Sequence, residues 1–527
     1  MRNFLTMMDT MTPAQVLTLA FGSVTDLVGS HARRDPEHAA LIHGQRRFSF
    51  AQLDAAMERV AASLQREGLR PGDAVAICAA ACIDYAVVFL GALRAGVTVA
   101  PLAPSSTAES LVAMLADCNA RLLFLDGGAA ATLAPVTPQI SVGCIALDAG
   151  GGGLPLADWL LPAGSTAAAV QPQPHWPFNI IYSSGTTGAP KGIVQPYAMR
   201  WAHVQRSGVF GYGPETVTLL STPLYSNTTL VSFFPTIALG GTVVLMEKFD
   251  AGKYLALAQQ HRVTHTMLVP VQYQRIMDRP DFATYDLSSF RMKFCTSAPF
   301  AAALKADILA RWPGGLVEYY GMTEGGGTCI LAAHEHPHKL HTVGKPGPDH
   351  EIRLIDEQGR EVAVGESGEV VGRSAAMMTG YHGLPQATAA AEWHDAAGQR
   401  YIRTGDLGRF DADGFLTLLD RKKDMIISGG FNIYPSDLEA VLQQHEVIAD
   451  CAVVGLASRR WGETPAAFVV LQPGATVSKE ALLAWTNARL GKTQRLAALE
   501  IVDALPRSAI GKVLKRELRD SFGALCD

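Results

Sequence analysis

Apolar runs of strand length recur between residues 74 and 297, and segments with helical spacing lie between several of them. One such segment, from Ser49 to Glu67, has apolar residues every three or four positions, and a Pro-Gly turn then leads into the run at 74–78. Strands that alternate with helices in this way predict an α/β fold with substantial parallel sheet. The other runs are 122–126, 179–183, 242–246, 266–270 and 293–297.

The pattern changes twice toward the C-terminus. From about Val343, short strands separated by turns predict a small β subdomain at about 343–420. After the charged segment 420-DRKKD-424, helical and strand patterns alternate again, at 435–445, 451–456, 466–471 and 479–490. We therefore expect a large N-terminal domain, residues 1–420, of mixed, largely parallel sheets, and a small α+β C-terminal domain, residues 421–527.

Charge and hydropathy exclude several classes of function. The net charge is −5 and the pI about 6.3, and no block of like charge occurs, so no nucleic-acid partner is expected. The N-terminal residues lack the apolar core of a signal peptide. Asp84 and Arg94 interrupt the most hydrophobic region, 74–102, so a buried helix followed by a strand is expected there rather than a transmembrane segment. These features predict a cytoplasmic location.

The stretch 180-IIYSSGTTGAPKGIV-194 places a loop rich in glycine and hydroxyl side chains directly after a strand-like run. Its backbone amides can form an anion-binding nest, and Lys191 adds a mobile positive charge. The loop is not a Walker A motif, because Pro190 precedes the lysine and Gly192 follows it. A phosphate-binding loop is predicted, with an ordinary surface loop as the alternative. Its expected ligands are Ser183, Ser184, Gly185, Thr186, Thr187, Gly188 and Lys191.

Three further blocks follow in a fixed order: 319-YYGMTE-324, 401-YIRTGDLGRFDADGFLTLLDRKKDMIISGGFNIYP-435 and 506-PRSAIGK-512. Together with the loop they resemble the motifs of the adenylate-forming superfamily, which includes acyl-CoA synthetases, luciferases and adenylation domains. The resemblance extends from about Phe48 to Leu518. It implies a C-terminal domain that is mobile and carries a catalytic lysine.

The resemblance implies a role for each residue of the second block. Tyr320 would stack on adenine, with Ser297, Ala298 and Pro299 on the other face, where the family usually has Gly-Ala-Pro. Thr323 would hydrogen-bond the α-phosphate, and Glu324 would hold Mg²⁺ together with Thr187. The nucleotide site would also include Gly321 and Met322. Without the other blocks, 320-YGMTE-324 is typical of a turn.

The remaining blocks would complete the site. The resemblance places Asp406 and Arg421 on the ribose, Lys423 at the domain hinge, and Gly429 and Gly430 along the pantetheine arm of coenzyme A. Lys512 would bridge the substrate carboxylate and the α-phosphate, where a cation stabilises the transition state most. In isolation, these segments are typical of a turn, a solvated charge run and a surface lysine.

Two positions depart from the family pattern. Tyr197 and Ser226 stand where the family often has histidines, so the positioning of the carboxylate is in question. Asn227, Thr228 or a backbone amide could substitute for the second histidine. No acidic residue occurs between Ser221 and Thr236, which argues against an amino-acid substrate. The expected acyl pocket consists of Tyr225, Ser226, Asn227, Thr228, Gly325 and Gly326.

The predicted function is an ATP-dependent carboxylate–CoA ligase that uses ATP, Mg²⁺ and coenzyme A. The expected substrate is an aryl, alicyclic, or medium- or long-chain fatty acid, and a homodimer is left open. Three alternatives remain: transfer of the acyl group to a carrier-protein thiol, a luciferase-like oxidation, and a non-catalytic nucleotide-binding module. Each alternative predicts a different observation: a loaded carrier protein, light or oxygen uptake, or ATP binding without pyrophosphate–ATP exchange.

Overall fold

The structure is a computed structural model that describes residues 11–183, 190–421, 424–428, 431–458, 461–491, 494–508 and 511–522. The chain forms two compact units. The first comprises the residues up to Leu340 together with 346–351 and 372–402, and the second comprises 341–345, 352–371 and the residues from Arg403 onward. The expected domain division at residues 420–421 stays a prediction.

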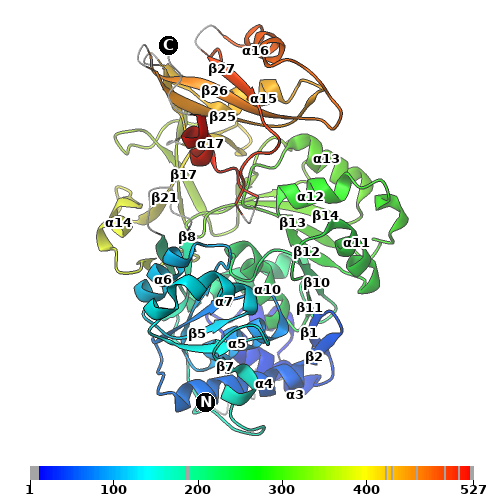
Figure 1. Cartoon of the computed structure of the whole chain (residues 1–527), viewed down its shortest axis with the longest axis vertical. Coiled ribbons are helices and arrows are strands. Elements are labelled where there is room, and N and C mark those ends of the chain that lie inside the picture. The colour runs from blue at the N-terminus through cyan, green and yellow to red at the C-terminus, as the bar shows by residue number, and fades with distance from the viewer. Residues whose placement is uncertain are drawn as a thin grey trace. The chain divides into compact units, whose positions relative to one another are not determined.

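One large sheet of the first unit has nine strands in the order β16-β15-β14-β13-β12-β10-β11-β1-β2 (Figure 1). Pairing is parallel from β14 through β13, β12, β10 and β11 to β1, which confirms the predicted α/β fold. The strands are β1 Ala39–His43, β2 Arg46–Ser49, β10 Val217–Leu220, β11 Thr242–Leu245, β12 His265–Leu268, β13 Met292–Cys295, β14 Gly315–Tyr320, β15 Cys329–Ala332 and β16 Lys345–Pro346.

The other large sheet has eight strands in the order β19-β9-β8-β4-β3-β5-β6-β7. The run predicted at 74–78 is strand β3, and all five of its side chains are buried, as expected for an interior parallel strand. The strands are β3 Ala74–Cys78, β4 Thr98–Leu102, β5 Ala120–Leu125, β6 Gly143–Ala146, β7 Leu154–Pro155, β8 Pro177–Ser183, β9 Lys191–Pro196 and β19 Gly380–Tyr381. The short strand β20, Glu392–His394, pairs separately with the first residues of β21.

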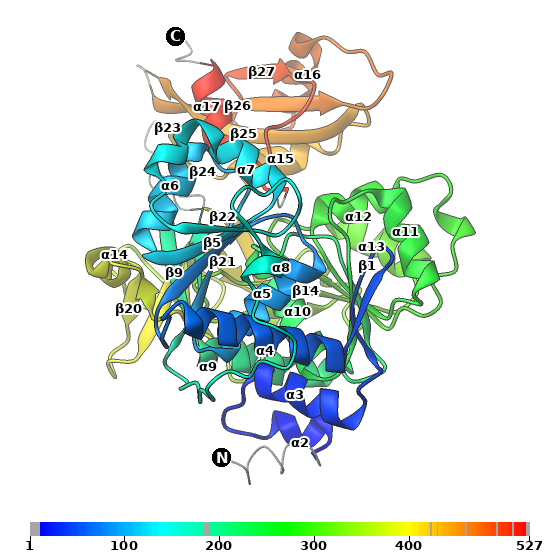
Figure 2. The ribbon, with the colours of Figure 1, turned by 60° about the horizontal axis from the view of Figure 1, so that its bottom comes forward.

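Helices cover the two sheets of the first unit. Helix α4 begins at the residue after Ser49, whose hydroxyl accepts from the amide of Gln52 while the Gln52 side chain accepts from the Ser49 amide, a reciprocal capping box. Helices α3 and α4 lie side by side and pack on α5 (Figure 2). The helices are α2 Pro13–Leu17, α3 Val24–Arg34, α4 Phe50–Arg66, α5 Ile83–Arg94, α6 Ala108–Asp117, α7 Gly127–Leu133, α8 Leu156–Trp159, α9 Tyr197–Arg206, α10 Asn227–Ala238, α11 Ala251–Gln260, α12 Pro270–Met277, α13 Ala302–Arg311 and α14 Pro385–Ala390.

The second unit contains two smaller sheets. Along β25, Val453 faces Leu438 and Leu482 of α15 and α16, whereas its neighbour Val454 packs in a separate core with Leu518 of α17, as the two-residue period of a strand requires. The elements are β17 Glu351–Ile355, β18 Ser367–Arg373, β21 Arg400–Phe410, β22 Leu416–Arg421, β23 Ile426–Ser428, β24 Phe431–Ile433, α15 Pro435–Leu442, β25 Ile448–Ser458, β26 Gly462–Leu471, α16 Lys479–Asn487, β27 Ala498–Ile501 and α17 Lys515–Phe522.

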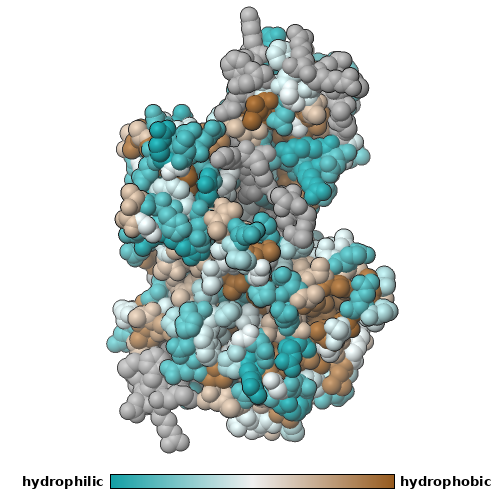
Figure 3. Space-filling view, turned by 90° about the vertical axis from the view of Figure 1, so that its left-hand side faces the viewer, coloured by the Kyte–Doolittle hydropathy of each residue, from teal (hydrophilic) through white to brown (hydrophobic). Residues whose placement is uncertain are grey.

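The surface is of mixed polarity. On the face shown in Figure 3, hydrophilic and hydrophobic residues are intermixed. Large exposed apolar side chains come from separate places in the sequence, such as Leu154, Val209, Val364 and Leu384. Among the described residues, no helix has both the length and the hydrophobicity needed to span a membrane.

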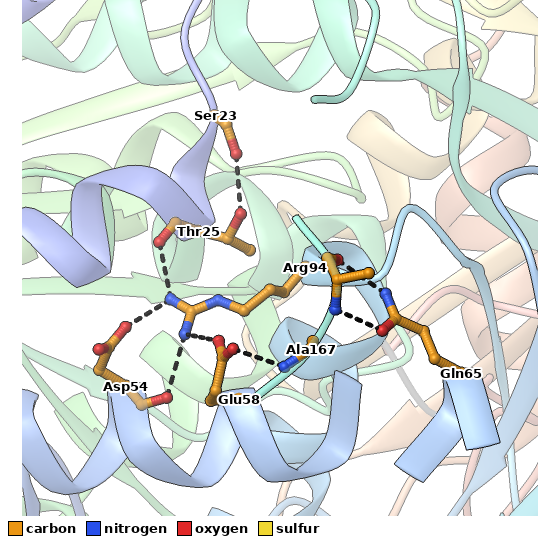
Figure 4. Close-up of polar contacts among 8 residues, drawn as sticks. Ser23, Thr25, Asp54, Glu58, Gln65, Arg94 and Ala167 are labelled. Carbon is orange, nitrogen blue, oxygen red and sulfur yellow. Dashed lines mark hydrogen bonds and ion pairs between the residues drawn. The ribbon is translucent and has the colours of Figure 1, made fainter. Parts of the chain in front are cut away.

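Arg94, at the end of α5, joins three parts of the first unit (Figure 4). Its guanidinium donates to Asp54 Oδ1 at 2.5 Å, to Glu58 Oε2 at 3.1 Å and to the Thr25 carbonyl at 3.1 Å. The second oxygen of Glu58 accepts from the amide of Ala167 at 2.8 Å. The charge that interrupts the hydrophobic region therefore pairs with two carboxylates on α4 and links this helix to α3 and to the segment near residue 167.

We expect Arg94→Met to lower the thermal midpoint by several degrees, because it leaves two carboxylates partly buried without their partner, at a cost of about 2–3 kcal/mol. Arg46→Met is the matched control, since the Arg46–Asp84 ion pair at 2.6 Å has a half-exposed arginine and should contribute about 0–1 kcal/mol. Differential scanning fluorimetry of the two variants decides the point. Equal shifts of the thermal midpoint would show that the ion pairs of Arg94 stabilise the protein no more than the surface ion pair of Arg46.

Candidate active site

Three of the predicted segments follow the carboxyl ends of parallel strands in the nine-stranded sheet. Residues 225–228 follow β10, 297–299 follow β13, and 320–324 follow or end β14. Ligand sites in open α/β sheets lie at this edge. Two hydrogen bonds join the strand ends: Thr228 Oγ1 and Ser297 Oγ are 2.5 Å apart, and Thr296 Oγ1 donates to the Tyr319 carbonyl at 2.8 Å.

Ser297 has a left-handed backbone conformation, with φ at +82°. Glycine adopts this conformation at little cost, and other residues adopt it rarely. This explains physically why glycine is usual at this position of the motif. In this chain a strained serine occupies it instead, and its hydroxyl is within hydrogen-bonding distance of Thr228.

Two glycines after the TE pair are packed against backbone. A Cβ atom on Gly325 would lie 2.0 Å from the carbonyl oxygen of Ala376, and one on Gly326 would lie 2.8 Å from that of Gly372. The φ angles are +77° and +93°, which also favour glycine. Close packing against the segment 372–376 is therefore a sufficient reason for both glycines. Their role as walls of the acyl pocket stays a prediction.

Glu324 is held in place by strand β19 of the eight-stranded sheet and by a residue just before it. The hydroxyl of Tyr381, on β19, donates to Glu324 Oε1 at 2.9 Å, and the Glu324 carbonyl accepts from the amide of Met378 at 2.8 Å. Burial, and then the charge of Glu324, raise the pKa of Tyr381 above its ordinary value, so its hydroxyl remains a donor. Within the described residues, Glu324 Oε2 makes no hydrogen bond, so it is available to a ligand.

Lys191 lies over the same tyrosine. Its Nζ atom is 5.2 Å from the centre of the Tyr381 ring. Strand β9, which begins at Lys191, pairs with β19 on one side and with β8 on the other. The cation of the first motif and the carboxylate of Glu324 therefore both contact the side chain of Tyr381. A cation and a carboxylate gathered around one residue suit a nucleotide phosphate with its metal ion.

A buried polar network lies behind the TE pair. Gln195 Nε2 donates to the Thr323 carbonyl at 2.6 Å, and Gln195 Oε1 accepts from Asn179 Nδ2 at 2.9 Å and from Arg200. Arg200 also donates to Asn179 Oδ1 at 3.0 Å and to Asn227 Oδ1 at 2.9 Å. Each of these amide orientations is set by the donors and acceptors around it.

Arg200 is 1% exposed, and its partners in this network are neutral amides. Burial lowers its pKa to about 9, so it remains charged at neutral pH. The rings of Phe178 and Phe234 lie 5.9 and 5.7 Å from the guanidinium carbon. Among the described residues, no carboxylate pairs with this buried charge. An uncompensated buried cation is costly unless hydrogen bonds or a bound anion offset it.

Asn227, one of the residues of the predicted acyl pocket, lies at the end of this network. Its Oδ1 accepts from Arg200 at 2.9 Å and from Gln195 at 3.3 Å, which leaves Nδ2 as the remaining donor. Nδ2 makes no hydrogen bond to any described residue. Ser226, the N-cap of α10, makes no side-chain capping bond. Asn227 is therefore a structurally supported candidate for the role that a histidine usually has in the motif.

Tyr197, the other departure from the family pattern, is a core residue. Its side chain is 3% exposed, its hydroxyl donates to the Leu93 carbonyl at 3.0 Å, and its ring packs edge-on against Phe178. Tyr225 is partly buried, and burial raises the pKa of its hydroxyl.

Other predicted residues belong to the second unit or lie outside the described residues. Asp406 on β21 is buried, and its backbone pairs with that of Arg421 on β22. Lys512 follows Gly511, and its amide donates to Ser508 Oγ at 3.2 Å. Several predicted residues lie outside the described part of the chain: Ser184, Gly185, Thr186, Thr187, Gly188, Lys423, Gly429 and Gly430.

Sequence reasoning missed three residues of the site: Gln195, Arg200 and Tyr381. Gln195 is the one polar side chain that β9 buries completely, which an alternating strand pattern does not reveal. Tyr381 lies far along the chain from Glu324. A polar residue inside the apolar run after Lys191 was the available signal for Gln195.

Two parts of the chain match models of known protein families. A model of the AMP-binding enzyme family matches residues 29–382, and a model of the AMP-binding enzyme C-terminal domain matches residues 437–512. A feruloyl-CoA synthase of Amycolatopsis sp. is 34% identical over 503 residues, which cover 93% of this chain and 97% of that protein.

Two further relatives have different named substrates. An indoleacetate–CoA ligase of Aromatoleum aromaticum is 32% identical over 94% of this chain and 97% of its own length. A fatty acid–[acyl-carrier-protein] ligase, ScoC of Streptomyces coeruleorubidus, is 32% identical over 93% and 95%.

Solved structures show the same fold. The amide bond synthetase McbA of Marinactinospora thermotolerans has a TM-score of 0.84 and 27% identity, over 96% of this chain and 100% of that one. An o-succinylbenzoate CoA synthetase of Bacillus subtilis, solved with ATP and a magnesium ion, has a TM-score of 0.80 and 27% identity, over 94% of this chain and 99% of that one.

Proposed function

From the premise that this chain belongs to the adenylate-forming, AMP-binding enzyme superfamily, we propose that it is an ATP-dependent carboxylate–CoA ligase. The chain is an AMP-forming acid–thiol ligase by its relatives, and ATP is its nucleotide substrate. The proposal adds that the thiol is that of free coenzyme A. The observation that supports phosphate binding is that Lys191 and Glu324 both contact the side chain of Tyr381.

The first half-reaction is attack by the substrate carboxylate on the α-phosphorus of ATP, which forms acyl-AMP and releases pyrophosphate. Asn227 Nδ2 donates to the carboxylate and fixes its direction of approach, because Arg200 and Gln195 hold the amide in one orientation. Lys191 contacts the departing phosphates. From its place in the family motif, Lys512 bridges the carboxylate and the α-phosphate.

Magnesium fits this site. The ion is commonly bound by one or two carboxylates together with substrate phosphates, and Glu324 offers a free oxygen at the end of a fixed side chain. The described residues contain no cluster of three or more His, Cys, Asp or Glu side chains that could bind a metal. Glu324, with Thr187 as the predicted second residue, would hold the ion, and its charge would neutralise the phosphates.

The second half-reaction is attack by the thiol on the acyl carbon of acyl-AMP, which forms the thioester and releases AMP. We propose that rotation at the predicted hinge, Lys423, separates the two steps, and that Gly429 and Gly430 line the path of the thiol arm. The proposal also assigns Asp406 and Arg421 to the ribose of the nucleotide, and it requires a mobile C-terminal domain.

The acid is proposed to be aryl, alicyclic, or a medium- or long-chain fatty acid. The named substrates of the relatives include an aromatic and an indole acid as well as a fatty acid. The fatty acid–[acyl-carrier-protein] ligase among them favours a second candidate, transfer to a carrier-protein thiol. A cytoplasmic enzyme and a homodimer remain expectations.

A two-part assay tests the function. The full chain is incubated with ATP, magnesium and fatty, benzoic, cinnamic or alicyclic acids, and pyrophosphate–ATP exchange and acyl-CoA formation are measured. We expect acid-dependent exchange without coenzyme A and a thioester when it is added. Binding of ATP without exchange would indicate a non-catalytic module. Thioester formation only on a carrier protein would show that the acceptor is a carrier-protein thiol and not free coenzyme A.

Asn227→Asp tests how the carboxylate is positioned. Aspartate keeps an oxygen for Arg200 and Gln195 but removes the Nδ2 donor and adds a negative charge beside the substrate. We expect the KM for the acid to rise about tenfold or more, because a hydrogen bond to a charged group is lost and repulsion replaces it, while the KM for ATP changes little. An unchanged KM for the acid would exclude Asn227 as its ligand.

A further inference from the structure

Arg200 forms hydrogen bonds with side chains from four elements. Its Nε atom donates to Asn179 Oδ1 on β8 at 3.0 Å, Nη1 donates to Asn227 Oδ1 on α10 at 2.9 Å, and Nη2 donates to Gln195 Oε1 on β9. Nη1 also approaches Nδ1 of His203, three residues further along α9, at 3.5 Å. Arginine can only donate, so this Nδ1 atom is the acceptor. The guanidinium is therefore fixed from several directions.

The partners of Arg200 in these hydrogen bonds are uncharged. Three are amides, and burial, followed by the charges of Arg206 and Arg200, lowers the pKa of His203 well below its ordinary value, so its ring is neutral as well. Among the described residues, no aspartate or glutamate forms an ion pair or hydrogen bond with this guanidinium. A neutral donor would orient the amides at a lower desolvation cost than a buried cation. The full charge therefore points to a role beyond the orientation of amides.

Two amides connect this charge to the active site. Asn227 Oδ1 accepts from the charged donor, which polarises the amide and makes its Nδ2–H group a stronger donor. In the proposed function, this is the group that donates to the reacting carboxylate. Gln195, which also accepts from Arg200, donates to the Thr323 carbonyl at 2.6 Å. One buried cation therefore connects the residue proposed to bind the acid with the block proposed to bind the nucleotide.

An anion and a neutral group respond differently to a buried cation. Electrostatic attraction is stronger in a buried site, because water screens it less than at the surface. A carboxylate that accepts from Asn227 Nδ2 is stabilised by the charge of Arg200 as well as by the hydrogen bond. A neutral group of the same shape gains only the hydrogen bond. A preference for the charged group is a property that the orientation of Asn227 alone does not produce.

We propose that Arg200 is the positioning residue for the reacting carboxylate, and that its charge, acting through Asn227, makes the site prefer a carboxylate to an uncharged group of the same shape. The proposal rests on the proposed ligase function. It names a source of positive charge in a chain that has Ser226 where the family often has a histidine. The alternative is a purely structural role, in which Arg200 supports the shape of the pocket only.

Acids and their primary amides test the proposal. Cinnamate is paired with cinnamamide, and octanoate with octanamide, because each amide keeps the shape and one acceptor oxygen of the acid but carries no charge. Titration calorimetry measures the dissociation constants of both members against the full chain. We expect the wild type to bind the acid at least about tenfold more tightly than the amide in one or both pairs. Arg200→Met should weaken acid binding about tenfold or more and amide binding less than about threefold.

Enzyme kinetics and a conservative variant provide further measurements. In pyrophosphate–ATP exchange, Arg200→Met should raise the KM for the acid about tenfold or more and change the KM for ATP less than about threefold. Arg200→Lys keeps the charge, and its preference for the acid should stay within about threefold of that of the wild type. If Arg200→Met does not fold, Arg200→Gln replaces it, because glutamine keeps a donor for the buried oxygens without the charge. The same losses are then expected.

Two comparisons serve as controls. Arg94→Met removes another arginine of the first unit, whose ion pairs lie on α4, and it should leave the ratio of acid to amide affinity unchanged. In an Asn227→Ala background, Arg200→Gln should change acid binding less than about threefold, since Arg200 acts through Asn227. Equal weakening of acid and amide binding by the Arg200 substitutions, or an unchanged ratio, would overturn the proposal.

The binding measurements separate this inference from the proposed function. If the wild type prefers an acid to its amide, Arg200→Met or Arg200→Gln loses that preference, and no acid supports exchange, the ligase function fails and the role of Arg200 stands. If acids support exchange but the wild type binds acid and amide equally, the function stands and the role of Arg200 is rejected. Binding of neither acid to the wild type also rejects that role.

Discussion

Lys512→Ala is expected to lower the rate of acyl-AMP formation about 10²- to 10³-fold while leaving the second half-reaction within about tenfold of the wild type. Adenylation brings a carboxylate and a phosphate, both anions, into contact, and a cation placed between them stabilises the transition state far more than the separated reactants. Thioester formation from acyl-AMP involves no such approach of two anions to the α-phosphorus. The two rates must be measured separately, as pyrophosphate–ATP exchange and as conversion of supplied acyl-AMP with coenzyme A.

The control for this prediction is another lysine of the second unit. Lys479 pairs with Glu500 at 2.9 Å at the surface and is about half exposed, so Lys479→Ala should affect neither half-reaction. Equal losses in both half-reactions of Lys512→Ala would contradict the assigned role. An unaffected first half-reaction would show that the cation comes from elsewhere, with Lys191 as the next candidate.

The periodic parts of the fold were predictable from local pattern. The helix expected between Ser49 and Glu67 is α4, and the helices expected at 435–445 and 479–490 are α15 and α16 with C-terminal ends three residues earlier. The run predicted at 74–78 is β3. Fully buried parallel strands are continuous apolar runs, so composition alone reveals them, but their order in the sheet depends on contacts distant in sequence.

The motif residues were predictable as a set, and the side chains that hold them were not. Glu324 belongs to a recognisable block, but Tyr381, which orients it, lies 57 positions later. Arg200 looks in the sequence like any charged residue on a helix, yet it is buried in the first unit with its donors on three amides. Burial of an unpaired charge depends on tertiary packing, which a local pattern does not record.

Gly325 and Gly326 were predicted to belong to the acyl pocket from their place directly after the TE pair. Their close packing against the backbone of residues 372–376 is a sufficient reason for glycine at both positions, so their role in the pocket stays a prediction.

Glu324→Gln is the second substitution with a large expected effect. The amide keeps the size of the side chain and can still accept from Tyr381, but it removes the charge that would hold magnesium and balance Lys191. We expect kcat for adenylation to fall about 10²- to 10³-fold and the magnesium concentration needed for half-maximal rate to rise, as measured by exchange at fixed ATP and varied magnesium.

Tyr381→Phe separates the charge of Glu324 from its orientation. The phenylalanine keeps the ring under Lys191 and removes only the hydroxyl that fixes Oε1, so a smaller loss of about tenfold is expected. Tyr401→Phe is the matched control, because the Tyr401 hydroxyl donates to Glu351 at 2.6 Å in the same unit. The double variant Glu324→Gln/Tyr381→Phe should be no slower than Glu324→Gln alone, since the hydroxyl acts only through the carboxylate. Additive losses would mean that Tyr381 has a separate role, for example in holding Lys191, and a magnesium requirement unchanged in Glu324→Gln would remove Glu324 from the metal site.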